Sequence, residues 1–177
     1  MAKHISDFSK LPDEVVFDLI NEQNGTALNN TMVTLGTPVR EAGVGVSYNT
    51  NITVTALETS DYAGSVTLGY NRLDVEGFLY GETLTLPRDE AVTFADLIPA
   101  INERLKTNIT TDDYVDGPIG AWQGVPNETK QIVITMKPSS KVFIGSLRLT
   151  LAHEEIPLST VIVQKLLLGL VYQPPGT

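Results

Sequence analysis

The chain has 177 residues, of which 42% are hydrophobic and 19% are charged, a composition typical of a globular protein. The formal net charge is -9, and the basic residues are scattered along the chain. This disfavours nucleic-acid binding, because a surface that follows phosphates needs a basic patch. There are no cysteines, so a disulfide framework and a thiolate metal site are both excluded.

The N-terminal segment, residues 1–10, carries Ile5 and Phe8 among polar neighbours and has no periodic pattern. It also lacks the apolar stretch of a signal peptide. We expect it to be a docking arm that a neighbouring subunit holds through Ile5 and Phe8. Burial of these two side chains would offset part of the entropy lost when a short arm becomes ordered.

A first helix is predicted to begin at Pro12, because proline suits the first helical position. Asp13 and Glu14 follow in the first turn, where carboxylates complement the helix dipole. Asn24-Gly25 indicates the end of the helix. Its buried stripe would consist of Val15, Val16, Leu19 and Ile20.

Residues 51–75 are the clearest strand signal in the chain, and they predict a hairpin. Two stretches of alternating apolar and polar residues flank the polar loop 58–64, which ends in glycine. The apolar faces of the two strands are Ile52, Val54 and Ala56, and Val66, Leu68 and Tyr70.

A second helix is predicted after this hairpin. Residues 78–80 and 84–86 would first pair around Gly81-Glu82. Thr93 and Asp96 then form a variant of the capping box. Pro99 lies inside the helical pattern, so the helix is either kinked there or begins there. The apolar stripe is Phe94, Leu97, Ile98, Ile101 and Leu105.

Residues 110–130 are predicted to be a long loop, and loops of this length in a compact domain are often functional. They contain Tyr114 and the only tryptophan, Trp122. These two side chains are either anchors of a protein interface or plugs at the edge of the core. The pattern gives both alternatives equal weight.

The C-terminal third is predicted to form a second hairpin, with strands at residues 131–136 and 142–151. Residues 160–172 favour a strand over a helix. The apolar run 166–172 is interpreted as a core strand rather than a partner-binding strand, and it is too short to cross a bilayer. Residues 173–177 form a proline-rich tail that cannot join a sheet interior. We detect no internal repeat in the sequence.

Two groups of residues are candidates for metal binding or acid–base catalysis. Asp112, Asp113 and Asp116 could supply oxygen ligands to a cation, but their spacing does not match a calcium loop, so an Asp-capped turn on a solvated surface is the preferred interpretation. His153-Glu154-Glu155 could form a metal ligand or an acid–base pair, and again a solvated turn is preferred. The chain has neither a Gly-x-Ser-x-Gly motif nor a phosphate-binding loop. We therefore predict no enzyme activity, no cofactor and no metal site.

Several segments resemble a family of virion structural proteins of large tailed bacteriophages. These segments are residues 17–26, 33–38, 62–74, 95–102 and 109–113, and the similarity extends over about residues 15–172. In such proteins the segment Tyr70-Asn-Arg-Leu-Asp74 follows a strand. In this family such motifs are structural, and no active-site residues carry over.

The resemblance implies a structural component of a tailed-phage virion, most simply a capsid-associated or head-decoration protein present in many copies. The alternatives are a neck, tail or baseplate protein, or a carbohydrate- or receptor-binding module that uses Trp122, Tyr114 and Tyr62. Expected partners are major capsid or tail proteins and copies of the chain itself, with no nucleic acid and no membrane. The protein would be made in the bacterial cytoplasm and reside in the virion.

The predicted fold class is α+β: a β-rich antiparallel sheet or sandwich with two packed helices. Both hairpins would lie in the same sheet. The predicted organisation is a docking arm at residues 1–10, a single domain at 11–172 and a tail at 173–177. The predicted interface residues are Ile5, Phe8, Tyr114 and Trp122.

Overall fold

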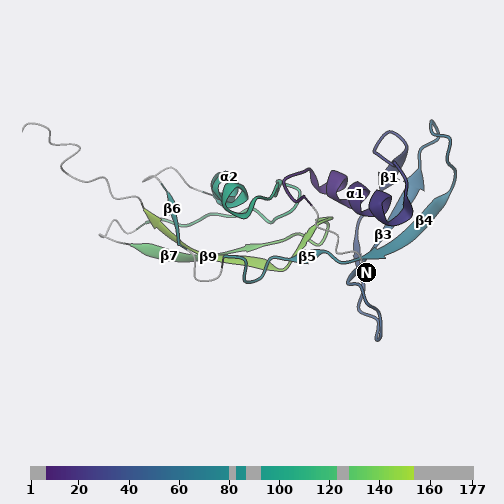
Figure 1. Cartoon of the computed structure of the whole chain (residues 1–177). Helices are drawn as coiled ribbons and strands as arrows, with labels where there is room; N and C mark the ends of the chain where they lie inside the picture. Colours follow the sequence, from purple (N-terminus) through teal and green to yellow (C-terminus); the bar gives the residue numbers. More distant parts are fainter. Residues whose placement is uncertain (1–6, 80–82, 87–92, 123–127, 154–177) are drawn as a thin grey trace, which may run out of the picture.

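The computed structural model describes residues 7–79, 83–86, 93–122 and 128–153. In these residues the fold is α+β, as predicted, with two helices packed on small β-sheets (Figure 1). The elements are α1 (Pro12–Asn24), β1 (Val33–Leu35), β2 (Val39–Arg40), β3 (Thr50–Ala56), β4 (Ser65–Tyr70), β5 (Leu73–Asp74), β6 (Thr83–Leu86), α2 (Phe94–Leu105), β7 (Thr129–Thr135), β8 (Phe143–Ile144) and β9 (Ser146–His153).

The strands form three sheets, and the two predicted hairpins lie in different ones. In the first sheet β3 is central, with β1 and β2 on one side and β4 on the other, all antiparallel. The second sheet has the order β6-β9-β7, in which β6 is parallel to β9. The third is the short parallel pair of β5 and β8.

The expectation of one sheet with both hairpins was therefore wrong. The pairing of residues 78–80 with 84–86 was also wrong, because β6 pairs with β9.

The first helix begins and ends where the sequence indicates, and the second begins after Thr93, one of its two predicted start positions. The carboxylate of Glu14 accepts a hydrogen bond from the Leu11 backbone at 3.0 Å, and that of Asp96 accepts one from the Thr93 backbone at 2.8 Å. Gly25 ends α1 in the left-handed conformation. Pro99 lies within α2 on its exposed side, so Thr93 and not Pro99 marks the helix start.

The two halves of the chain have the same architecture, although the sequence analysis found no repeat. Each half consists of a helix, a segment that pairs beside the first strand of a hairpin, and the hairpin itself. We define repeat 1 as residues 12–70 and repeat 2 as residues 94–153. Positions in repeat 2 correspond to those in repeat 1 at a spacing of 81, or of 80 for residues 50–60, which places Ile20-Asn-Glu22 on Ile101-Asn-Glu103 and Gly64-Ser65 on Gly145-Ser146.

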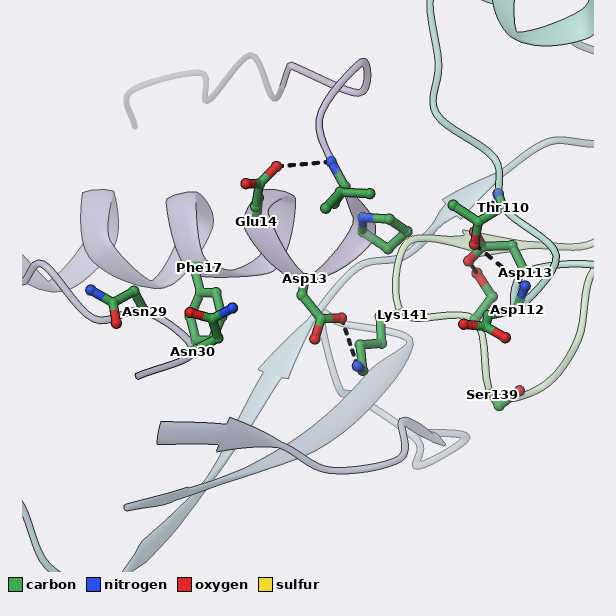
Figure 2. Close-up of a pocket in the computed structure, with 13 residues that line it drawn as sticks. Asp13, Glu14, Phe17, Asn29, Asn30, Thr110, Asp112, Asp113, Ser139 and Lys141 are labelled. Atoms are coloured by element: carbon green, nitrogen blue, oxygen red, sulfur yellow. Dashed lines mark hydrogen bonds and ion pairs between the residues drawn. The ribbon is translucent and has the colours of Figure 1, made fainter. Parts of the chain in front are cut away.

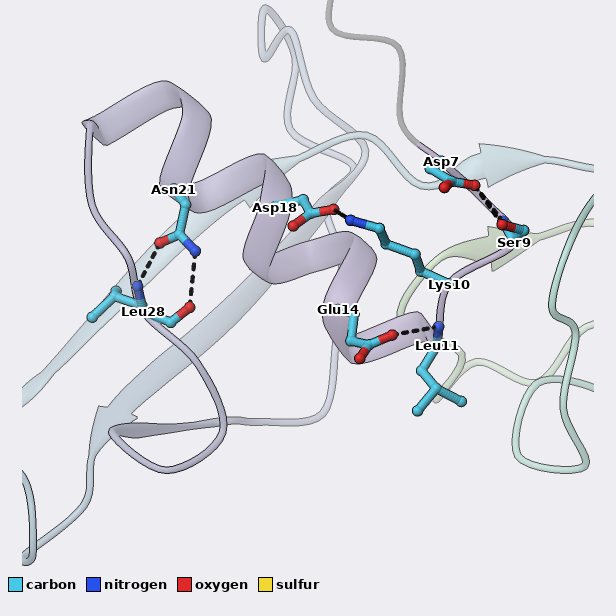
Figure 3. A network of polar contacts seen from close by, with 8 residues as sticks. All are labelled: Asp7, Ser9, Lys10, Leu11, Glu14, Asp18, Asn21 and Leu28. Atoms are coloured by element: carbon cyan, nitrogen blue, oxygen red, sulfur yellow. Dashed lines mark hydrogen bonds and ion pairs between the residues drawn. The ribbon is translucent and has the colours of Figure 1, made fainter.

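The turn after each helix is built by one asparagine in the same way. The side-chain oxygen of Asn21 accepts a hydrogen bond from the Leu28 backbone at 2.7 Å, and its amide donates to the Leu28 carbonyl at 2.8 Å (Figure 3). The same oxygen also accepts a hydrogen bond from the Thr26 hydroxyl at 2.8 Å. Asn102 makes the corresponding three bonds at 2.8, 2.9 and 2.9 Å, with Ile109 and Thr107 as partners. Because the geometry is the same bond by bond, the duplication extends to side-chain detail.

The hairpins of the two repeats also share their register. Val54 pairs with Val66 in repeat 1, and the corresponding residues Ile134 and Leu147 pair in repeat 2. Each hairpin tip contains a glycine with positive φ, Gly64 at 84° and Gly145 at 87°. The carbonyls of these glycines accept hydrogen bonds from the backbones of Ala56, the last residue of β3, at 2.9 Å and of Met136, which follows β7, at 3.0 Å. The two hairpins therefore follow one backbone plan.

Residues 71–93 link the two repeats, and the described parts of this linker contact repeat 2. The Leu73 backbone donates to the Val142 carbonyl at 2.7 Å, and the Val75 backbone donates to the Ile144 carbonyl at 3.0 Å. Val75 and Leu79 are buried and belong to a hydrophobic cluster that contains residues of both repeats. Figure 1 shows β5 between the two units, the β3–β4 hairpin at one end and β6 at the other.

Candidate functional site at the junction of the repeats

The segment Tyr70–Asp74 forms the junction of the two repeats. The Tyr70 hydroxyl donates a hydrogen bond of 2.6 Å to the Lys141 carbonyl of repeat 2. Asn71 accepts from the Asn49 backbone at 2.8 Å, and Leu73 and Asp74 form β5. Its residues therefore hold the halves together rather than line a reaction centre.

Arg72 is the central residue of this junction and is buried. Its guanidinium donates to the Thr50 hydroxyl of repeat 1 and to the carbonyls of Pro138 and Ser140 of repeat 2, each at 2.8 Å. Burial lowers the pKa of Arg72 and raises the pKa of Tyr70, because it disfavours the charged form of each group. The fixed fork of donors allows one side chain to bond to both repeats.

A polar pocket of about 470 Å³ lies beside this junction (Figure 2). Its walls are the first turn of α1, residues 29–30 of repeat 1, and the turns 110–113 and 139–141 of repeat 2. Asp13 forms an ion pair with Lys141 across the pocket at 2.6 Å. The pocket is thus an inter-repeat surface with hydroxyl, amide and carboxylate groups, and its lining residues include no histidine.

The three acidic residues considered as cation ligands, Asp112, Asp113 and Asp116, do not gather around one point. Asp113 is buried, and its carboxylate accepts hydrogen bonds from the Thr110 backbone (2.9 Å), the Thr110 hydroxyl (2.8 Å) and the Ser140 hydroxyl (2.6 Å). Asp116 accepts from the backbones of Ala95 at 3.1 Å and Gly117 at 2.9 Å. The Asp-capped turn is confirmed, but Asp113 caps it from a buried position rather than a solvated one.

These carboxylates therefore stabilise turns of repeat 2. Within the described ranges, no three His, Asp or Glu side chains come close enough to hold a metal ion. The side chain of His153, together with Glu154 and Glu155, lies outside the described residues.

The predicted interface residues have different environments. Tyr114 is only 2% exposed and lies in the core, where burial raises its pKa, so the core alternative is correct for this residue. Trp122 is half-buried against the core, and the Lys130 ammonium lies 4.7 Å from its ring centroid. An interface role for Trp122 stays a prediction.

The part of the N-terminal arm that the structure describes packs on its own chain. Phe8 lies against Phe143, with ring centroids 6.5 Å apart. Lys10 forms an ion pair with Asp18 of α1 at 2.6 Å, and Ser9 is bonded to Asp7 (Figure 3). Phe8 therefore has an aromatic partner in repeat 2 of its own chain, and a contact of the arm with a neighbouring subunit stays a prediction. Ile5 lies outside the described residues, as does the predicted strand at 160–172.

Sequence reasoning missed Arg72 as a functional position and missed the junction altogether. The signal that could have found it was the repeat itself, since shared residues such as Asn21 and Asn102 recur at a constant spacing. A segment that lies between two repeats is expected to make contacts with both.

Comparisons with known proteins place the chain in one family. None of the curated proteins and none of the solved structures matches it. No helix in the described part of the chain is long and apolar enough to cross a membrane. One family model matches residues 5–177, which include both repeats, the linker and the C-terminal segment. The chain therefore belongs to that family, the family of unknown function DUF7941.

Proposed function

We propose that this protein is a structural component of a tailed-phage virion, present in many copies and associated with the capsid as a head-decoration protein. The observation that carries the proposal is the resemblance of its segments, among them residues 70–74, to virion proteins of large tailed phages. These residues join two repeats by hydrogen bonds and strand pairing. Because the motif that carries the resemblance joins the two repeats in this chain, it supports a structural role in a particle.

The use of the polar groups also supports this proposal. The buried Asp113 and Arg72 satisfy the hydrogen bonds of turns and of the repeat junction. Proteins that assemble in many copies need such rigid junctions, together with exposed surfaces for their neighbours. Repeat 1 exposes large apolar side chains, among them Val39, Val44, Tyr62 and Val66.

A neck, tail or baseplate position is the alternative within the same class. The proposed partners are major capsid proteins or tail proteins, together with copies of the chain. The carbohydrate-binding alternative is weakened, because Tyr114 is buried and Trp122 and Tyr62 belong to different halves of the molecule. A sugar-stacking platform would need its aromatic faces exposed and close together.

The test is the location of the protein in purified particles. Particles are separated from free protein by density-gradient centrifugation, split into heads and tails, and analysed by quantitative mass spectrometry. We expect the chain in the head fraction in many copies per particle. Its recovery with tails would replace the head-decoration proposal by the tail alternative. Its absence from gradient-purified particles would refute a virion function altogether.

A further inference from the structure

We propose that the protein assembles head to tail with copies of itself, and that the chain after β9 of one copy packs on the hairpin tip and the β4 edge of repeat 1 in the next copy. This goes beyond the proposed function, because it states which surfaces meet and in what order. The proposal does not depend on the position of the protein in a particle.

The first observation is the way in which the linker covers repeat 2. Leu73 of β5 pairs in parallel with Phe143 at the tip of the second hairpin, and Asp74 pairs with Ile144. Further along the linker, β6 closes the outer edge of β9, where Thr83 pairs with Thr150. The hairpin of repeat 2 is thus completed by the stretch of chain that follows the hairpin of repeat 1.

The second observation is that the corresponding residues of repeat 1 are exposed to solvent. Tyr62 is the counterpart of Phe143, and it is 53% exposed where Phe143 is 1% exposed. Val66 is the counterpart of Leu147, and it is 53% exposed where Leu147 is fully buried. In the described part of the chain, no strand pairs with the outer edge of β4. Repeat 1 therefore presents, uncovered, the surface that on repeat 2 is covered by the linker and, at Phe143, also by Phe8 of the N-terminal arm.

The third observation is that the edge of β4 has none of the protection that natural proteins give to edge strands. Its sequence, Ser65-Val-Thr-Leu-Gly-Tyr70, contains no charge and no proline. Unpaired backbone groups on such an edge favour addition of a strand. The tip and the edge together form one continuous receiving surface.

The occupant follows from the repeat. The stretch after β4 covers a repeat-2 hairpin, so the stretch after β9 is its counterpart and would cover a repeat-1 hairpin. Position by position, Ile156 corresponds to the buried Val75, and Glu155 corresponds to Asp74. The chain continues after β9 to residue 177, which is far enough to replace the whole linker.

The geometry of the molecule favours a second copy as the source of that segment. Figure 1 shows the β3–β4 hairpin at the end of the molecule opposite to β6 and β7, while the tip of the second hairpin lies at the junction. Repeat 2 follows repeat 1 along the molecule. If the same step is taken again, the next unit beyond repeat 2 is repeat 1 of another copy. Contacts of this heterologous kind produce rings or filaments rather than closed two-fold dimers.

Engineered cysteines give a direct test, because the natural chain has none. Asp74 and Ile144 are paired neighbours, and their counterparts are Glu155 and Ala63. Neighbouring positions in paired strands lie within disulfide range. In the full chain, we expect oxidised A63C/E155C to give a ladder of covalent multimers. A mixture of the two single variants should stop at dimers, and each single variant alone should stay unlinked.

The double variant also separates the competing occupants. An intramolecular disulfide in the monomer would mean that the C-terminal segment folds onto its own repeat 1, and a double variant that stops at dimers would mean a reciprocal exchange. Either result, or no disulfide at all, overturns the head-to-tail proposal. These outcomes do not depend on where the protein resides in a particle, so they are independent of the virion test.

A matched pair of charge substitutions tests the receiving surface in the absence of cysteines. Val66→Lys places a charge on β4, whereas Val133→Lys places one at a similarly exposed valine of β7, outside the proposed surface. By sedimentation velocity over a concentration series, we expect the full chain to self-associate and Val66→Lys to weaken association by about tenfold or more. Val133→Lys should leave association unchanged. Equal effects of the two substitutions, or a wild-type protein that is monomeric at all concentrations, would refute the proposal.

Discussion

The two hairpins share one backbone plan but differ in how their inner faces are covered. In repeat 2, Leu147, Leu149 and Leu151 are all buried and belong to one hydrophobic cluster with the linker residues Val75 and Leu79. In repeat 1 the corresponding residues of β4 are half-buried or exposed. The difference shows that strand pattern determines which residues share a face, while another segment of the chain determines whether that face is buried.

The largest effect that this comparison predicts is at the pair Leu147 and Val66. Leu147→Ala removes a fully buried side chain and leaves a cavity, so we expect a loss of about 3 kcal/mol in the free energy of unfolding. Val66→Ala, at the corresponding exposed position, should cost less than about 1 kcal/mol. Urea denaturation of both variants at a concentration where the wild type is monomeric measures the difference. Equal losses would show that the hairpins do not differ in coverage.

The junction between the repeats should be the next most sensitive region. Arg72→Met removes three hydrogen bonds and leaves the carbonyls of Pro138 and Ser140 without this donor, so we expect a loss of about 2 kcal/mol. Arg40→Met is the matched control, because Arg40 is exposed on β2, and its effect should stay within about 0.5 kcal/mol. A neutral Arg72→Met would mean that the linker strands alone hold the repeats together.

The glycines at the two hairpin tips sharpen the comparison further. Gly64 and Gly145 both have a φ that favours glycine, so alanine should cost about 1 kcal/mol at either position. At Gly145 an added Cβ would also collide with the Asp74 carboxylate of the linker, whereas at Gly64 it meets open space. We therefore expect about 2 kcal/mol for Gly145→Ala in thermal unfolding of the isolated chain. Equal costs would indicate that the carboxylate moves aside freely.

Local signals in the sequence predicted the elements well. Pro12 and Gly25 bound α1, Thr93 begins α2, and the alternation around Ile52 predicted β3, because each of these features acts within a few residues. The predicted hairpin of residues 131–136 and 142–151 is also present, as β7 followed by β8 and β9.

The arrangement of these elements was not predictable in the same way. Pairing of β6 with β9 joins residues far apart in the chain, and no local pattern in Thr83–Leu86 specifies it. Asp113 was expected at a solvated surface, because a charged triplet suggests exposure, yet Thr110 and Ser140 satisfy its carboxylate in a buried site. The repeat was missed because the matching residues are few and are separated by 80 or 81 positions.

The smallest predicted effect concerns pH and the junction tyrosine. Burial raises the pKa of Tyr70, whose hydroxyl donates to the Lys141 carbonyl at 2.6 Å. The unfolded chain loses this proton near pH 10 while the folded chain retains it. The stabilisation is therefore complete below pH 10 and falls as the pH rises above it, by at most about 1.4 kcal/mol per pH unit.

Tyr70→Phe removes both the hydrogen bond and this titration. We expect it to lower the free energy of unfolding by about 1 kcal/mol at neutral pH. Above pH 10 the variant should lose stability less steeply than the wild type. Part of the slope should remain, because burial also raises the pKa of Tyr114. Urea denaturation from pH 8 to 11 measures both effects, with Tyr62→Phe as the control for an exposed tyrosine. Parallel curves for Tyr70→Phe and the wild type would show that the Tyr70 hydroxyl is open to solvent and that the junction is looser than its hydrogen bonds imply.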